Sequence, residues 1–262
     1  VISRSAKPGY SSFLVTSSEQ LEGRSTVVAN LAWALSESGR RVIVVDSDFQ
    51  SPTIHTLFGL PNHIGLSNIL QEQEWLVRQR TQPMNGTSPI LNRMGMGKAV
   101  AVATNGVGHA HELTPSNGMA MATEIHHEAT KEADPVDIAS ILNKSLEVSI
   151  ANSLQRSMIP GVQVLATGPL TLNNPAQLLS TVRFTALMEQ LHHHADVVLV
   201  DAPAYMSATY TSTLASVVDA VVFVVGYGRV KQDIVKDTLS QLETVNPNIL
   251  GIAANWANQK KR

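Results

Sequence analysis

The sequence predicts an α/β fold in which helices cover both faces of a doubly wound, mostly parallel sheet. Six short runs of β-branched residues are nearly continuous in apolar character, as expected of strands covered on both faces. Amphipathic stretches separate these runs, so strands alternate with helices and βαβ units follow. Right-handed crossovers then give the doubly wound arrangement. The predicted strands are Phe13–Thr16, Arg41–Val45, Val162–Ala166, Asp196–Val200, Ala220–Val225 and Ile249–Ala253.

The segments between these strands carry helical periodicity. In the first of them Val28, Leu31, Ala32 and Leu35 fall at i, i+3, i+4 and i+7. This spacing places the four side chains on one face of a helix, which can pack on the sheet. The predicted helices are Ser25–Ser38, Ala176–His192 and Val230–Val245.

Residues 72–161 differ in composition from the rest of the chain. They are rich in Gly, Asn, Ser, Thr, Met and His, and a helical pattern is visible only near Val136–Leu154. A structureless loop of this length is uncommon inside a compact domain. Because the flanking strands are strongly patterned, we predict a single domain over residues 1–262 with a partly flexible insertion at 72–161.

Composition excludes several classes of protein. The 262 residues include 19 Lys and Arg against 21 Asp and Glu, a net charge of −2, so no basic face for nucleic acid is expected. An apolar content of 44 % argues against a disordered chain. The absence of cysteine excludes disulfides, thiolate zinc sites and a cysteine nucleophile.

A short segment after the first predicted strand has the form of a phosphate-binding loop. Gly23-Arg24-Ser25-Thr26 opens a helix, whose N-terminal amides can face an anion, and Gly23 allows the backbone to approach it. Ser25 is placed to offer a hydroxyl to Mg²⁺. In the pattern G-x-x-x-x-G-K-[ST], Ser18 replaces the first Gly and Arg24 replaces the Lys. An ordinary strand-to-helix connection with a Ser or Thr cap would carry a similar segment.

Aspartates follow two of the predicted buried strands. Asp46 and Asp48 end the second strand, and Asp201 ends the strand that begins at residue 196. Open α/β sheets bind ligands at this carboxyl edge, and carboxylates together with Ser25 can hold Mg²⁺. A single strand-end Asp is usually a helix cap or a turn former. The three motifs in this order favour a nucleotide site of the P-loop NTPase type.

These residues resemble a known family, the bacterial tyrosine kinases of exopolysaccharide synthesis, which are the cytoplasmic domains of polysaccharide co-polymerases. The family belongs to the broader MinD/ParA-like group of P-loop ATPases. The resemblance covers about residues 12–71 and 162–256. It rests on a Walker A segment (16–32), a Walker A′ segment (41–60), the Gly-Pro…Asn-Pro-x-x-Leu-Leu stretch (168–179) and the Walker B-like Asp201-Ala202-Pro203.

The resemblance implies that Mg·ATP binds at the loop 17–26. Ser25 and Asp201 would organise Mg²⁺, with Asp46 and Asp48 beside it. Asp46 would also accept a proton from an attacking tyrosine or water. The other implied nucleotide contacts come from Ser18, Glu22, Gly23, Arg24, Thr26 on the α-phosphate side, and Asn255 near the adenine.

The resemblance also implies an activity and partners. The family transfers the γ-phosphoryl group to tyrosines in the C-terminal tail of a neighbouring subunit, so a homo-oligomer is implied. It regulates the chain length and export of a polysaccharide together with membrane polymerase and export machinery. The implied location is the cytoplasm, at the inner face of the cell membrane.

Several positions depart from the family pattern. Arg24 replaces the Walker Lys, Gln20-Leu21 replaces Pro-Gly, Gln50 replaces an Arg, and Tyr210 stands where an Asp is usual. No tyrosine-rich stretch follows Asn255. Together these changes suggest a weakened kinase. Two alternatives stay open, a non-catalytic nucleotide-sensing scaffold of a polysaccharide co-polymerase and a partitioning ATPase of the MinD/ParA type.

Overall fold

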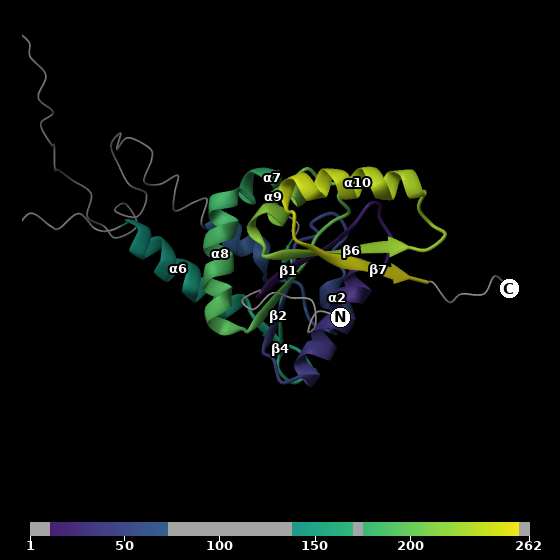
Figure 1. Cartoon of the computed structure of the whole chain (residues 1–262). Helices are drawn as coiled ribbons and strands as arrows, with labels where there is room; N and C mark the ends of the chain where they lie inside the picture. Colours follow the sequence, from purple (N-terminus) through teal and green to yellow (C-terminus); the bar gives the residue numbers. More distant parts are fainter. Residues whose placement is uncertain (1–10, 73–137, 170–174, 257–262) are drawn as a thin grey trace, which may run out of the picture. The chain divides into compact units, whose positions relative to one another are not determined.

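A seven-stranded sheet with helices on both faces forms the fold (Figure 1). The computed structural model describes residues 11–72, 138–169 and 175–256. The strand order is β3-β4-β2-β5-β1-β6-β7, and every neighbouring pair is parallel except β3 with β4. This arrangement confirms the predicted α/β class with a doubly wound, mostly parallel sheet.

The six predicted strands all form, with ends that differ by one or two residues from the prediction. The central strands are buried along nearly their whole length because helices cover both faces of the sheet. The additional strand β3 has only two residues, too few to leave a pattern in the sequence. The strands are β1 Ser12–Ser17, β2 Val42–Asp46, β3 Gln155–Arg156, β4 Val162–Leu165, β5 Val197–Asp201, β6 Ala220–Gly226 and β7 Ile249–Asn255.

The predicted single helix over 176–192 is wrong, because the chain forms two helices there. Ser180 is extended, with φ −63° and ψ 150°, and separates α7 from α8. Residues 66–72 are also helical. Among the helices that the structure describes, none combines the length and apolar character needed to cross a membrane. The helices are α2 Arg24–Glu37, α3 Ile54–Leu57, α6 Ile138–Ser153, α7 Pro175–Leu178, α8 Thr181–His194, α9 Tyr210–Val217 and α10 Gln232–Val245.

Alternate residues of the strands pack against opposite helix layers. Phe13 and Val15 of β1 belong to an apolar cluster with residues of α2 and α3. Leu14, between them, belongs to a second cluster with residues of α6, α8, α9 and α10. The continuous apolar character of the strands therefore reflects two cores, one on each face.

Helix α6 lies within the predicted insertion but packs with the sheet. Its Leu146 and Ile150 are buried in the same cluster as Phe184 and Leu187 of α8. The helix α6 therefore belongs to the same compact unit as the strands β1 and β2, which precede the predicted insertion. The rest of the insertion prediction falls on residues 73–137, which lie outside the described residues.

Candidate functional site

Three strand ends meet at one edge of the sheet. β5 is paired in parallel with both β1 and β2, so the carboxyl ends of these strands lie side by side. Asp46 and Asp201, the last residues of β2 and β5, are partners in the strand register. β1 ends beside them at Ser17. The fold therefore brings the predicted acidic residues to the edge where open α/β sheets bind ligands.

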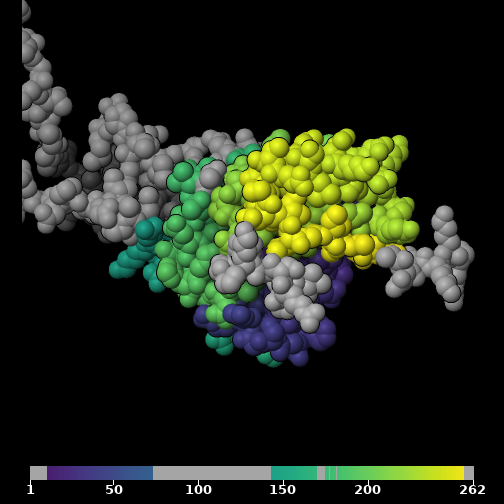
Figure 2. Space-filling model, in the orientation of Figure 1, coloured from purple at the N-terminus to yellow at the C-terminus, as the bar shows by residue number. Residues whose placement is uncertain are grey.

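The loop after β1 turns into α2 through Gly23. This residue has φ +86°, a left-handed conformation that costs glycine little, and it precedes α2 without a side-chain cap. A Cβ at this position would overlap the amide nitrogen of Asn255, which donates a 3.3 Å hydrogen bond to the carbonyl of Glu22. In Figure 2 yellow atoms of the C-terminal part of the chain border purple atoms of its N-terminal part. A bare helix N-terminus thus faces the carboxyl edge of the sheet, as anion binding requires.

Glu22 fixes the shape of this loop. Its Oε1 accepts a 2.7 Å hydrogen bond from the amide of Glu19, and its Oε2 accepts one of 2.7 Å from the amide of Gly226 at the end of β6. The side chain is only 2 % exposed. Both carboxylate oxygens are therefore bonded to the backbone, which ties the loop to the sheet.

Arg24 folds back into the loop instead of pointing to solvent. Its Nη1 donates to Ser17 Oγ at 3.0 Å and to the carbonyl of Glu19 at 3.2 Å. Its Nη2 donates to Asp48 Oδ2 at 2.9 Å, which forms a buried ion pair. The guanidinium that replaces the usual Lys ammonium therefore has a carboxylate as its partner.

Ser25 joins the first turn of α2 to the end of β5. Its hydroxyl donates a 2.6 Å hydrogen bond to Asp201 Oδ2 and accepts one of 2.8 Å from Thr53 Oγ1. The other carboxylate oxygen of Asp201 is buried and has no hydrogen-bond partner in the described part of the chain. Ser25 and Asp201, predicted to hold Mg²⁺, are therefore in direct contact.

Asp46 is bonded to the segment that follows it. Its Oδ1 accepts a 3.2 Å hydrogen bond from the amide of Asp48, and its Oδ2 accepts one of 3.2 Å from the amide of Ile54. Thr167 Oγ1 donates to its backbone carbonyl at 3.4 Å. Asp46 therefore anchors both the loop at 47–53 and the start of α3.

Burial makes the charged forms of these carboxylates costly. The pKa of Asp46 lies well above its usual range because the group is buried and faces the Asp201 carboxylate. Burial raises the pKa of Asp201 to about 7, against the opposing effects of the Ser25 hydrogen bond and the Arg24 charge. A divalent cation at this edge would favour the ionised form of both groups.

Three buried polar atoms at this edge lack a hydrogen-bond partner among the described residues. They are Ser18 Oγ, Arg24 Nε and Asp201 Oδ1. Buried polar atoms are normally paired, so these atoms mark positions that a bound group would complete. Carboxylate and hydroxyl oxygens suit a hard cation, and a guanidinium nitrogen suits a phosphate. The residues present therefore fit both Mg²⁺ and a nucleotide.

The described residues contain no group of three or more His, Asp and Glu side chains arranged to hold a metal ion by themselves. Mg²⁺ is usually held through one or two carboxylates, waters and substrate phosphates. A cation at Ser25 and Asp201 would thus take most of its remaining ligands from water and from the nucleotide.

Thr26 and Asn255 complete the predicted set. The Thr26 side chain is exposed on the first turn of α2, and Asn255 lies at the end of β7 against the loop. Sequence reasoning missed Thr53 and did not foresee that Tyr210 would be buried, with its ring 6.1 Å from that of Phe49. The sequence feature that could have drawn attention to Thr53 is its position in the Walker A′ segment, directly after Pro52.

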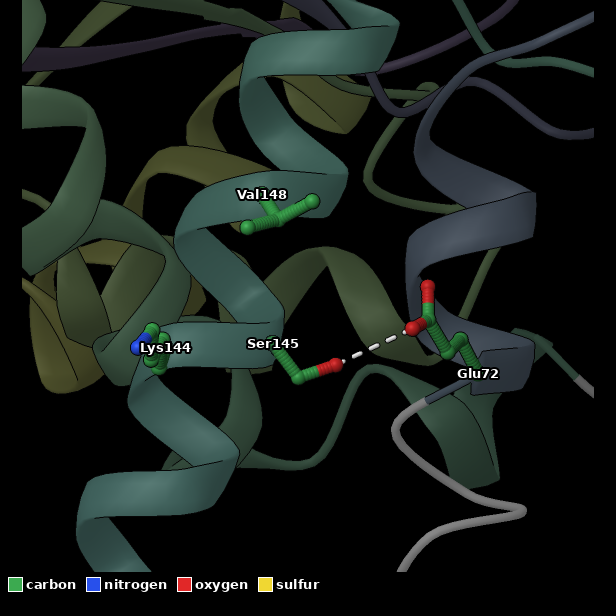
Figure 3. A pocket seen from close by; sticks show the side chains of 4 residues that line it. All are labelled: Glu72, Lys144, Ser145 and Val148. Atoms are coloured by element: carbon green, nitrogen blue, oxygen red, sulfur yellow. Dashed lines mark hydrogen bonds between the residues drawn. The ribbon is translucent and has the colours of Figure 1, made fainter.

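A separate groove of about 310 Å³ lies between the helical residues 66–72 and α6 (Figure 3). Glu72 accepts hydrogen bonds from Ser145 Oγ at 3.0 Å and from Ser149 Oγ at 2.5 Å. Lys144 and Val148 complete its lining. None of the predicted site residues lines this groove.

Comparison with known proteins identifies relatives of the whole described core. The model of the CobQ/CobB/MinD/ParA nucleotide binding domain matches residues 15–258. The chain is 21 % identical over 244 residues to the putative tyrosine-protein kinase CapB of Staphylococcus aureus, covering 93 % of this chain and 74 % of CapB. It is 23 % identical over 250 residues to the tyrosine-protein kinase YwqD of Bacillus subtilis, covering 95 % and 74 %.

The fold also matches solved structures. The crystal structure of the chimerical protein CapA2B2 superposes with a TM-score of 0.64 at 22 % identity, covering 97 % of this chain and 79 % of that one. At this identity the likeness concerns the fold alone.

Proposed function

The chain belongs to the CobQ/CobB/MinD/ParA nucleotide-binding domain family, and we propose that it binds Mg·ATP as a tyrosine-kinase-like domain that regulates exopolysaccharide chain length and export. The hydrogen bond between Ser25 and Asp201 carries this proposal, because it joins the phosphate loop to the Walker B-like strand beside an unpartnered carboxylate oxygen. The names of the relatives, tyrosine-protein kinases, supply the reaction class.

In the proposed complex the phosphates lie against the amides that begin α2 and against Arg24, near Ser18, Glu22 and Gly23. The backbone amides supply hydrogen bonds and the partial positive charge of the helix N-terminus. The remaining proposed contacts are Thr26 on the α-phosphate side and Asn255 near the adenine.

Ser25, Asp46 and Asp201 are the proposed metal-site residues, with Asp48 next to them. Bound Mg²⁺ would neutralise charge that develops on the phosphate oxygens. Asp46 is also the proposed general base, a role that the resemblance to the bacterial tyrosine kinases implies for this carboxylate.

A non-catalytic, nucleotide-sensing scaffold is the second candidate function. The observation that favours it is the ion pair between Arg24 and Asp48, which holds the guanidinium within the loop. Phosphoryl transfer depends on positioning, so a misplaced cation can weaken transfer while binding persists. Gln50 stands where the family usually has an Arg, so this position lacks a positive charge. Its side-chain amide donates a 2.9 Å hydrogen bond to the carbonyl of Ser207. A partitioning ATPase of the MinD/ParA type is the third candidate function and ranks below the other two.

Assembly and location belong to the same proposal. We expect a homo-oligomer that works with membrane polysaccharide polymerase and export machinery at the cytoplasmic face of the membrane. No nucleic-acid partner is expected from the net charge of −2.

Transfer from γ-labelled ATP, measured beside ATP turnover, separates these functions. A kinase incorporates label into tyrosine, and the Asp46→Asn variant abolishes incorporation. A scaffold binds Mg·ATP without incorporation or turnover. ATP-dependent dimers that bind DNA or lipid would instead indicate the partitioning ATPase. Absence of nucleotide binding would overturn all three.

A further inference from the structure

Building on the proposed Mg·ATP site, we propose that Thr53 is a positioning residue for the divalent cation. Its hydroxyl fixes the orientation of the Ser25 hydroxyl, so that one oxygen lone pair of Ser25 remains directed for the metal ion. Thr53 is outside the phosphate loop and outside the strand ends from which the other metal-site residues come.

The hydrogen-bond geometry defines which lone pairs are used. A serine hydroxyl has one proton and two lone pairs. The Ser25 proton is donated to Asp201 Oδ2 at 2.6 Å, and one lone pair accepts the Thr53 proton at 2.8 Å. One lone pair of Ser25 therefore remains, and its direction is set by the other two bonds.

The backbone at Thr53 explains why its hydroxyl is available. Thr53 is the N-cap residue of α3, where a threonine side chain commonly accepts a hydrogen bond from the first turn of its own helix. It makes no such cap bond here. Asp46 Oδ2 instead accepts from the amide of Ile54, the first residue of α3. Because Asp46 at the end of β2 accepts the hydrogen bond from the first turn of α3, the Thr53 hydroxyl is available to donate to Ser25, 28 positions earlier in the chain.

These contacts link the two sides of the site. Asp46 holds the start of α3, Thr53 reaches from there to Ser25, and Ser25 reaches Asp201, the register partner of Asp46. Loss of the Thr53 hydroxyl leaves the bond to Asp201 as the remaining described hydrogen bond of the Ser25 hydroxyl, so the direction of its lone pairs is less restricted. Residues that orient a metal ligand typically change metal affinity by about 10-fold to 100-fold.

The test is a titration of Mn²⁺, followed by electron paramagnetic resonance of the free ion, with ADP and the full chain. Thr53→Val removes only the hydroxyl function at similar volume, and Thr53→Ser retains it. Thr56→Val is the matched control on α3, because the Thr56 hydroxyl contacts only His55 among the described bonds. ADP binding without metal is measured in parallel, since a purely structural role would weaken both.

We expect Thr53→Val to raise the dissociation constant for Mn²⁺ about tenfold, with Thr53→Ser and Thr56→Val within twofold of the unchanged chain and metal-free ADP binding unaltered. Mn²⁺ affinity equal to that of the unchanged chain in Thr53→Val would overturn the role of Thr53 alone. Failure of the unchanged chain to bind ADP with or without Mn²⁺ would overturn the proposed function and this inference together. Thermal unfolding checks that each variant folds, and Thr53→Ala replaces Thr53→Val if the latter does not.

Discussion

The Arg24 guanidinium donates a 2.9 Å hydrogen bond to the carboxylate of Asp48, and the two side chains are only 8 % and 5 % exposed. A guanidinium recognises carboxylate and phosphate with the same planar fork. Asp48 therefore satisfies Arg24 in the way that a phosphate group of a nucleotide would. In the proposed nucleotide complex, phosphate would replace Asp48 as the partner of Arg24.

The first prediction concerns this ion pair. Asp48→Asn keeps an acceptor for the amides of Gln50 and Ser51 but removes the ion-pair partner of the buried Arg24 guanidinium. Breaking a buried pair costs about 3–5 kcal/mol, so we expect the nucleotide-free protein to unfold several degrees lower. Mg·ADP should recover more stability in Asp48→Asn than in the unchanged chain. Thermal unfolding with and without Mg·ADP measures both, and an unchanged melting temperature would contradict a structural ion pair.

The sheet could be predicted from the sequence because buried parallel strands need continuous apolar runs. Val42–Val45 and Val197–Val200 show this directly, since residues on both faces are buried. Helix α9 was not predicted, because its eight residues are rich in Ser and Thr and show too little helical periodicity of apolar residues. The break between α7 and α8 depends on the extended backbone at Ser180, where no Gly or Pro marks a helix end.

The second prediction tests the close approach at Gly23. Gly23→Ala must adopt φ near +86° and also displace the Asn255 amide from the loop. Gly39→Ala is the matched control, because Gly39 has φ +80° and no atom lies within 4 Å of the position that a methyl group would take. The left-handed backbone costs each variant about 1 kcal/mol. We expect Gly23→Ala alone to lose nucleotide affinity, by calorimetry, and equal affinities in the two variants would refute the role of this contact.

The third prediction concerns the cost of the buried Asp201 charge. A carboxyl whose pKa is raised from near 4 to about 7 destabilises the folded state increasingly as pH rises from 4 to 7. At pH 8 this cost is at most about 4 kcal/mol. We expect Asp201→Asn to melt higher than the unchanged chain at pH 8 and by a smaller margin at pH 5, without added metal. A margin that does not grow with pH would contradict a buried, costly charge.

The fourth prediction concerns Asp219, which joins the start of β1 to β6. Its Oδ2 accepts 2.8 Å hydrogen bonds from the amides of Ser11 and Ser12 and from Ser12 Oγ. Burial opposes its charge, but these donors lower its pKa. Its stabilising effect is therefore present above about pH 4 and is lost as pH falls further.

Removal of that carboxylate should cost about 2 kcal/mol at pH 7, a magnitude typical of hydrogen bonds to a charged group. Chemical denaturation of Asp219→Ala measures this loss. Asp237→Ala, on the exposed face of α10, is the control and should change the free energy of unfolding by less than about 0.5 kcal/mol. Equal effects of the two substitutions would show that the contact with β1 is not stabilising.

The candidate site was only partly accessible from the sequence. The loop pattern placed Ser25 at the start of a helix and the strand pattern placed Asp201 at a strand end, so both were expected at the carboxyl edge of the sheet. The bond of Glu22 to the amide of Gly226 spans 204 residues and has no local pattern. The pairing of Arg24 with Asp48 also depends on tertiary contact. The sequence shows only that the guanidinium of Arg24 stands where the family has a Lys ammonium.

Calorimetric titration of Mg·ATP into the chain, with Arg24→Lys in parallel, decides whether this edge of the sheet is a nucleotide site. We predict that the unchanged chain binds Mg·ATP with one site per chain, and that removal of Mg²⁺ weakens binding. Failure of both the unchanged chain and Arg24→Lys to bind would contradict a nucleotide site at this edge. Binding by Arg24→Lys alone would contradict a working site in the unchanged chain and would leave the fold as a scaffold.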